Sequence, residues 1–435
     1  MIKKSLYISF VSILSLCATY GQDLLSTEDA VSRVLEENFS IKLARNNVEA
    51  GELGVSAGYA GMLPTVSAVV TDNNRILNME QTRSDGTVNK LDNARNNSLN
   101  YGVAMDWTIF DGFEMFARYD ELEANKNFNT AELKVSVLTT VNDVLVTYYN
   151  LVQIQQQLSA LDSSLVISRQ RLELAENRFS IGKASKLEVL NAKVDINTDQ
   201  TLYLQQQELY KNSKIRLNEL LVRELSTEFK VEDSIHVDPA LMLPELKSIA
   251  MEQNPNLVMQ QINQRIAELQ LKQIKAQRYP EVALTGGYDF SETESSLGFT
   301  TSSSSRGWNY GFRVSLNVFD GFNQNRNEKI ARIQVDNSKL VLAEQEQSLM
   351  SQLESTYQTY QTNLGLIDLE RENVDIAREN LNITIEKFRI GTITTLEFRT
   401  AQLNYINAQL RLNEAVFQAK ISEVALKALT GDLSI

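Results

Sequence analysis

The stretch that decides the fold is YGVAMDWTIFDGF at residues 101–113, which returns as YGFRVSLNVFDGF at residues 310–322. Both copies alternate bulky apolar side chains with small or polar ones, and both end on the same Phe-Asp-Gly-Phe turn. A strictly alternating run of about ten residues has the length that a tilted membrane-spanning strand needs. The two copies therefore predict one strand and turn, used twice.

The 209-residue offset between these copies continues on both sides, which identifies the whole chain as a duplication. It aligns several matching pairs, namely Tyr148 with Tyr357, Phe179 with Phe388, Ile181-Gly182 with Ile390-Gly391, and Leu187-Glu188 with Leu396-Glu397. Further upstream the offset becomes 216 and pairs Pro64 with Pro280. Each half therefore predicts a helix, two strands, a long helix and a short helix.

A secretory signal is predicted over residues 1–21, because Lys3 and Lys4 precede an apolar run too short to cross a bilayer. Cys17, the only cysteine, would leave with it. The first repeat is then expected over 22–222, the linker over 223–242 and the second repeat over 243–435. Within the first repeat we expect a β-hairpin at 65–110, a long helix at 113–178 and a short helix at 185–222. Within the second we expect a hairpin at 281–319, a long helix at 322–389 and a short helix at 392–430.

Composition excludes several functional classes. Without Lys3 and Lys4 the chain has 40 basic and 55 acidic residues, a net charge of −15, which argues against nucleic-acid binding. A single histidine, His236, and no remaining cysteine leave neither a histidine pair nor a thiolate for a metal. No phosphate-binding glycine-rich loop is present either. We therefore expect no enzyme activity and no cofactor.

The long helices carry a coiled-coil pattern. Residues 113–178 contain neither glycine nor proline, and a continuous helix of that length would measure roughly 100 Å. Apolar residues recur every seventh position, at Val137, Val144, Leu151, Leu158, Leu165, Leu172 and Phe179, and again at Leu353, Tyr360, Ile367, Val374, Leu381 and Phe388. The short helix at 185–222 and the stretch at 244–277 have similar lengths. Placed end to end, they would match one long helix.

The strands admit two interpretations. A soluble sheet packed against its own helices would also alternate. Two features favour strands in a bilayer. The polar stretches at 72–98 and 292–306 are expected as long loops, and the helices are too long to fold back over a four-stranded sheet. No other segment reaches 18 consecutive apolar residues, so membrane contact would fall to strands. Four strands cannot close a barrel, and an open edge cannot lie in lipid. Two chains would supply eight strands with a filled interior, and three would supply twelve with a lumen.

This duplicated plan, with Phe-Asp-Gly after the second strand of each half, resembles the TolC-like outer-membrane efflux proteins. The turns at 179–183 and 388–392, followed by Leu187-Glu188 and Leu396-Glu397, are similar to that family's periplasmic tips. The resemblance covers essentially the whole chain after the signal. It implies a mainly α fold with a small transmembrane β part, built as a trimeric α-barrel joined to a shared 12-stranded β-barrel. It also implies a homotrimer whose partners are a periplasmic adaptor and, indirectly, an inner-membrane pump.

The resemblance also implies site residues. An apolar-Gly-[Leu/Thr] tip docks the adaptor in this family, and Ile390, Gly391 and Thr392 fit that pattern. Its twin consists of Ile181, Gly182 and Lys183, and Lys183 departs from the pattern. Members place two acidic residues three apart in the tunnel mouth. Glu397 matches the first of these positions, whereas Thr400 occupies the second.

Gly182 and Gly391 are predicted to occupy tight inter-helix turns, because glycine takes the left-handed conformation that ends a helix at little steric cost. Glu188 and Glu397 each lie six residues beyond these glycines. Three copies of both would ring an opening with like charge, which favours cations. A glutamate that only complements a helix N-terminus is the alternative, preferred for Glu188. At the level of the whole chain, the predicted function is a passive outer-membrane channel of a tripartite efflux or type I secretion system. The alternative is a periplasmic coiled-coil adaptor or structural spacer, which would have one helical hairpin between soluble β domains.

Overall fold

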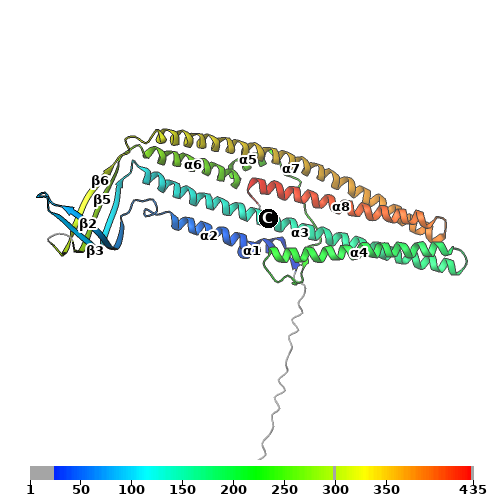
Figure 1. Ribbon diagram of the computed structural model, residues 1–435. Coiled ribbons are helices and arrows are strands. Elements are labelled where there is room, and N and C mark those ends of the chain that lie inside the picture. The colour runs from blue at the N-terminus through cyan, green and yellow to red at the C-terminus, as the bar shows by residue number, and fades with distance from the viewer. Residues whose placement is uncertain (1–23, 297–299, 433–435) are drawn as a thin grey trace, which may run out of the picture.

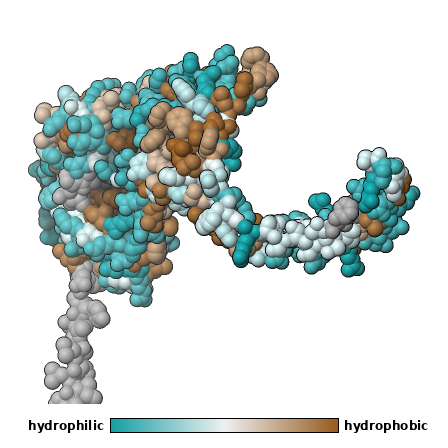
Figure 2. All heavy atoms as spheres, turned by 90° about the vertical axis from the view of Figure 1, so that its left-hand side faces the viewer, coloured by the Kyte–Doolittle hydropathy of each residue, from teal (hydrophilic) through white to brown (hydrophobic). Residues whose placement is uncertain are grey.

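The computed structural model describes residues 24–296 and 300–432. The signal expected over 1–21, with Cys17, lies outside these residues. The helices run side by side as a long shaft, with a β-sheet at one end and two helix–helix turns at the other (Figure 1). Seen from the sheet end, the sheet stands away from the helices as a thin curved arm (Figure 2).

The two halves repeat one order of elements. The first half contains β1 (Leu24–Leu25), α1 (Thr27–Glu37), α2 (Phe39–Gly54), β2 (Thr65–Thr82), β3 (Val88–Phe110), α3 (Glu114–Ser180) and α4 (Lys186–Leu220). The connecting segment holds β4 (Lys230–Val231), which pairs in parallel with β1. The second half contains α5 (Leu243–Gln253), α6 (Pro255–Ala276), β5 (Glu281–Ser295), β6 (Ser302–Ser315), α7 (Asn323–Ile390) and α8 (Thr395–Thr430).

The long helices follow from their sequence. Helix α3 has 67 residues and α7 has 68, and the seven-residue repeat places its apolar positions inside the shaft. Leu151, Leu165, Leu353, Tyr360 and Leu381 are all buried. Among the described residues, none of the helices combines the length and the apolar composition needed to cross a bilayer.

The leading helix of each half is divided in two by an asparagine. Asn38 separates α1 from α2, and Asn254 separates α5 from α6. Both have an extended backbone, and their side chains accept hydrogen bonds from Ser40 N (2.9 Å) and Leu257 N (3.1 Å). Asparagine is a favoured N-cap because its side-chain oxygen satisfies a free N–H of the first turn. One asparagine therefore ends one helix and begins the next.

The same two asparagines show which short helices meet end to end. Asn38 Nδ2 donates to Leu220 O (3.3 Å) at the end of α4, and Asn254 Nδ2 donates to Leu429 O (2.9 Å) near the end of α8. Helix α4 therefore abuts the first half's own leading helices, and α8 abuts those of the second half. The expected pairing of 185–222 with 244–277 was wrong. Equal length could not identify the partner, whereas a capping bond between helix ends does.

The four long strands form one antiparallel sheet in the order β2-β3-β5-β6. The polar stretches at 72–98 and 292–306 are mostly strand, contrary to the expected loops. Strands β2 and β3 stay paired until Thr82 meets Val88, and only 83–87 turn. Strand pairing uses backbone groups, so polar side chains do not end it. The two hairpins therefore reach well beyond the roughly ten residues that a bilayer needs.

Strand β6 is shorter than predicted. The hairpin was expected to extend to residue 319, but β6 ends at Ser315, which faces Glu281 at the start of β5. Residues 316–319 continue the apolar alternation without a neighbouring strand to bond. Alternation therefore identified the face of the strand but not its end.

The helices form a curved wall with two distinct edges. Helix α3 packs against α2 and α6 in the part of the shaft nearer the sheet and against α4 and α8 in the part nearer the two helix–helix turns (Figure 1). Helix α7 packs against α5, α6 and α8 along one side. Its opposite side carries exposed apolar residues spaced by seven, namely Leu369, Ile376, Ile383 and Ile390. The far edge of the wall, on α2 and α4, also exposes apolar residues, including Leu43, Leu53, Leu187 and Val194.

Candidate functional site

The sheet has one apolar and one polar face. On β6, Trp308, Tyr310 and Phe312 alternate along the strand, and Tyr310 is 91% exposed. Arg313, the residue after Phe312, lies on the other face, and its guanidinium reaches Asp106 on β3 at 3.1 Å. Exposing a row of large apolar and aromatic side chains to water costs free energy. The sheet is therefore built to meet an apolar medium on one side and water on the other.

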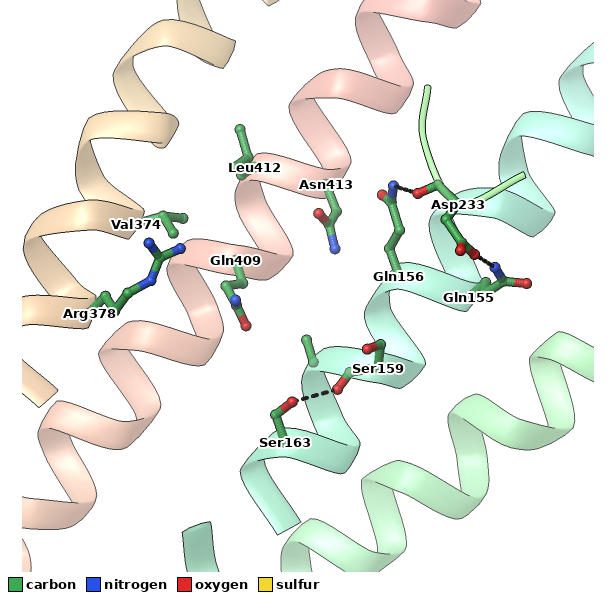
Figure 3. A pocket seen from close by; sticks show the side chains of 11 residues that line it. Gln155, Gln156, Ser159, Ser163, Asp233, Val374, Arg378, Gln409, Leu412 and Asn413 are labelled. Atoms are coloured by element: carbon green, nitrogen blue, oxygen red, sulfur yellow. Dashed lines mark hydrogen bonds between the residues drawn. The ribbon is translucent and has the colours of Figure 1, made fainter. Parts of the chain in front are cut away.

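A polar cavity of about 540 Å³ lies halfway along the shaft, between α3, α7 and α8 (Figure 3). Gln155, Gln156 and Gln409 contribute amides to its wall. Gln156 Nε2 donates to Asp233 O (2.8 Å), which fixes the connecting segment to α3. A hydrogen bond with Tyr405 raises the pKa of Arg378, which also lines the cavity. Within the described residues no cluster of three histidine, cysteine, aspartate or glutamate side chains could hold a metal.

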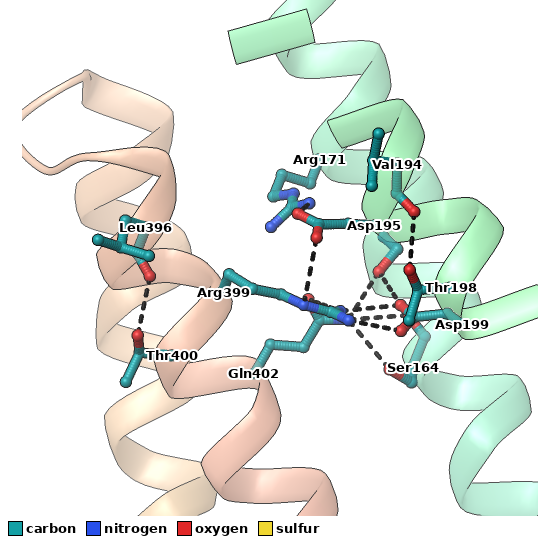
Figure 4. Close-up of polar contacts among 11 residues, drawn as sticks. Ser164, Arg171, Val194, Asp195, Thr198, Asp199, Leu396, Arg399, Thr400 and Gln402 are labelled. Atoms are coloured by element: carbon teal, nitrogen blue, oxygen red, sulfur yellow. Dashed lines mark hydrogen bonds and ion pairs between the residues drawn. The ribbon is translucent and has the colours of Figure 1, made fainter. Parts of the chain in front are cut away.

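Nearer the two turns, a buried ionic network joins the two halves (Figure 4). Arg399 on α8 contacts both oxygens of Asp199 on α4, at 2.7 and 2.9 Å, and lies 3.8 Å from Asp195. Arg171 on α3 also pairs with Asp195. Ser168 on α3 donates to Asp199 at 2.5 Å. Three helices are therefore held by two arginines and two aspartates.

Gln402, completely buried on α8, extends this network onto α3. Its Nε2 donates to Ser164 O at 3.0 Å and to Ser168 Oγ at 2.8 Å. Breaking one partner of a buried ion pair leaves an uncompensated charge, which costs about 3–5 kcal/mol. The network therefore opposes any separation of the α7–α8 hairpin from the α3–α4 hairpin.

Sequence reasoning missed this network, although the duplication contains a signal for it. At the 209-residue offset Asp199 corresponds to Ala408, and Arg399 corresponds to Leu190. Charged residues that replace apolar ones in a repeat mark positions where the halves have separate roles. A comparison restricted to matching positions could not find them.

Each hairpin ends in a turn of the same geometry. Gly182 and Gly391 have φ values of +75° and +83°, the left-handed conformation predicted for them. Lys183 N donates to Arg178 O at 2.8 Å, and Thr392 N donates to Lys387 O at 3.0 Å. These bonds are equivalent under the duplication. Ile181 and Ile390 are exposed beside the glycines. The α3–α4 and α7–α8 turns, which contain the six predicted tip residues, lie at the end of the shaft opposite the sheet (Figure 1).

The two predicted mouth glutamates differ in local role. Glu397 forms a complete capping box: its carboxylate accepts from Thr394 N (3.0 Å), and its own N–H donates to Thr394 Oγ1 (3.2 Å). At Glu188 the N–H donates to Ser185 Oγ (3.3 Å). The Glu397 carboxylate therefore caps its helix, whereas the helix-anchor role that the sequence favoured for the Glu188 carboxylate stays a prediction, because the bond at Glu188 uses only its backbone N–H. Lining of a mouth by either carboxylate stays a prediction.

The family model for outer membrane efflux proteins matches residues 30–222 and 246–432, so the chain belongs to that family. The chain is 20% identical over 412 residues to the probable efflux pump outer membrane protein TtgC of Pseudomonas putida, covering 93% of this chain and 82% of TtgC. It is 19% identical over 333 residues to the probable outer membrane lipoprotein SilC of Salmonella typhimurium, covering 76% and 71%.

Solved structures show the same fold. The Campylobacter jejuni CmeC outer membrane channel matches with a TM-score of 0.78 at 16% identity, over 93% of this chain and 85% of that one. The outer membrane protein VceC of Vibrio cholerae matches with a TM-score of 0.75, also at 16% identity, over 94% and 97%. The predicted fold class, a helical tunnel part with a small β part, is confirmed.

The protein is an outer-membrane channel protein of the efflux type, and its family and structural neighbours are channels rather than enzymes. Its place is the cell outer membrane. The alternative of a periplasmic adaptor required a single helical hairpin between soluble β domains. The described residues form two helical hairpins, α3–α4 and α7–α8, and one four-stranded sheet made of strands from both halves, which excludes that organisation.

Proposed function

We propose that three copies of this chain close into a ring that acts as a passive conduit from periplasm to exterior. The observation that carries the proposal is a sheet with two free edges, β2 and β6, at one end of a helical wall that also has two apolar edges. Joining β6 of one copy to β2 of the next gives twelve strands, enough for an open lumen. The same rotation brings the exposed apolar stripe of α7, formed by Leu369, Ile376, Ile383 and Ile390, against α2 and α4 of the neighbour.

The tips dock a periplasmic adaptor, which in turn connects the conduit to an inner-membrane pump. Ile181, Gly182 and Lys183 on one turn and Ile390, Gly391 and Thr392 on the other offer exposed apolar side chains and backbone at the far end of the shaft. Glu188 and Glu397 lie within the first turn of the following helices, where six copies would surround the mouth. No cofactor and no catalytic group takes part in such a conduit.

The docking role is tested with Gly391→Pro in the full-length protein. Proline removes the N–H that Gly391 donates to Phe388 O (3.0 Å) and cannot adopt φ +83°, so the turn must change. We expect export to fall severely while three-chain assembly in the membrane is unchanged. Gly365→Ala, in the middle of α7 with open space around it, is the control and should export normally. Normal export by Gly391→Pro would place adaptor docking elsewhere.

A further inference from the structure

A second pocket lies between the two helical hairpins, separate from the polar cavity of Figure 3. It measures about 270 Å³ and is bounded by α3 on one side and by α7 and α8 on the other. Ile167 and Leu174 on α3 face Ile385 and Phe388 on α7 and Phe398 on α8. The rings of Phe388 and Phe398 are 5.0 Å apart. The pocket therefore has apolar walls drawn from both halves of the duplication.

Arg171 supplies the polar part of this pocket. The residue is only 1% exposed, and one guanidinium nitrogen, Nη2, pairs with Asp195. Its Nε and Nη1 are also buried and have no hydrogen-bond partner among the described residues. The guanidinium lies 5.8 Å from the centre of the Phe398 ring, so an aromatic face, not an acceptor, covers it. Buried donors without acceptors are costly, and a ligand oxygen would relieve that cost.

The charges around the pocket favour an anion of modest size. Arg389 and Glu173 stand at the rim, both exposed, and Arg389 lies 3.4 Å from Glu386 on its own helix. The rim therefore has no large net charge, and the free Nε and Nη1 donors of the buried Arg171 are the groups that a ligand oxygen inside would meet. At about 30 Å³ for each small group, the volume holds roughly nine non-hydrogen atoms.

We infer that this inter-hairpin pocket binds an amphipathic monocarboxylate of roughly eight carbons, with its carboxylate on Arg171 and its tail against the apolar wall that includes Phe388 and Phe398. Two-sided walls mean that the bound molecule joins α3 to α7 and α8. A ligand that binds only this packed arrangement stabilises it by mass action. Occupancy therefore holds the hairpins together and resists their separation. Binding in this pocket needs neither the adaptor nor the tip turns.

The experiment uses the full-length protein in lipid nanodiscs, with octanoate as the ligand and octanol as its uncharged match. A diazirine derivative of octanoate is photolysed on the protein and the labelled peptides are mapped. We expect labels on α3 near Ile167 and on α7 near Ile385, displaced by octanoate at concentrations at least tenfold below those needed of octanol. Octanoate should also raise the unfolding temperature in a concentration-dependent way.

Variants decide whether the pocket is responsible. Ile167→Phe and Leu174→Phe each fill the space, and either should abolish the labelling, so a folding defect in one leaves the other. Arg171→Gln should remove the preference for octanoate over octanol. Val166→Phe alters the neighbouring exposed position, which does not line the pocket, and should bind normally. Equal competition by octanol, labels outside the two hairpins, or unchanged labelling in both filling variants would overturn the inference.

Discussion

At the scale of single residues, each helix–helix turn depends on one glycine in the left-handed conformation. Gly182 and Gly391 were predicted because a left-handed turn needs glycine, and the structure has that conformation at both. The partners of Arg399 could not be predicted in this way, because Asp199 is 200 residues away and lies on another helix. Hydrophobic periodicity reports which face of a helix is buried but not which residue of a distant helix it meets.

Glu397 has two separable roles, and substitution can divide them. Glutamine can still complete the capping box with Thr394 but carries no charge. We therefore expect Glu397→Gln to lower cation selectivity in single-channel recordings with little change in thermal stability. Glu397→Ala should lower selectivity equally and also cost about 1 kcal/mol of helix stability. Unchanged selectivity in the glutamine variant, with a stability loss only in the alanine variant, would leave Glu397 as a helix anchor alone.

At the scale of elements, the ionic network is a contact between the two halves that the duplication does not repeat, because Leu190 and Ala408 stand at the equivalent positions. Arg399→Leu inserts the residue that the first half has at position 190, and it leaves Asp199, which is 3% exposed, without its main cation. We expect the N-terminal part of α8 to lose about 3–5 kcal/mol of local stability, measured by hydrogen exchange. Adding Asp199→Ala, which copies Ala408, should recover most of that loss, because no buried charge is left unpaired.

The single variant Asp199→Ala completes a double-mutant cycle. It removes the Asp199 carboxylate but leaves Arg399 within reach of Asp195. Its cost should be smaller than that of Arg399→Leu. Additive losses in the double variant would show that the residues act independently. In that case the network would not be what holds the α7–α8 hairpin to α3 and α4.

At the scale of the whole molecule, the sequence predicted the duplicated plan and the long helices, but not which short helices meet end to end. The duplication and the seven-residue repeat are properties of the chain read in order. The abutment of α4 with α2, by contrast, depends on a hydrogen bond between Asn38 and Leu220 across 182 residues. Strand length was underestimated because polarity was taken to end β2, whereas backbone pairing continues to Thr82.

The edges of the molecule predict its assembly. Chemical cross-linking in a mild detergent should give a ladder that stops at three chains. Ile376→Glu together with Ile383→Glu places charges on the exposed stripe of α7, where a neighbour's α2–α4 edge would bury them. We expect this pair to shift the ladder toward one chain, because burying an unpaired carboxylate is costly.

Asn382→Glu is the control for that pair, since residue 382 is exposed on a different side of the same helix and should leave three chains intact. The contrast matters because added charge alone could perturb any long helix. If the exposed apolar residues of α7 only faced solvent, both variants would assemble alike. A chain that stays single in the membrane would leave β2 and β6 with unpaired backbone groups in lipid. Such a state conflicts with the cost of unsatisfied peptide groups there. The ladder therefore decides between a shared sheet and a surface whose apolar edges have another partner.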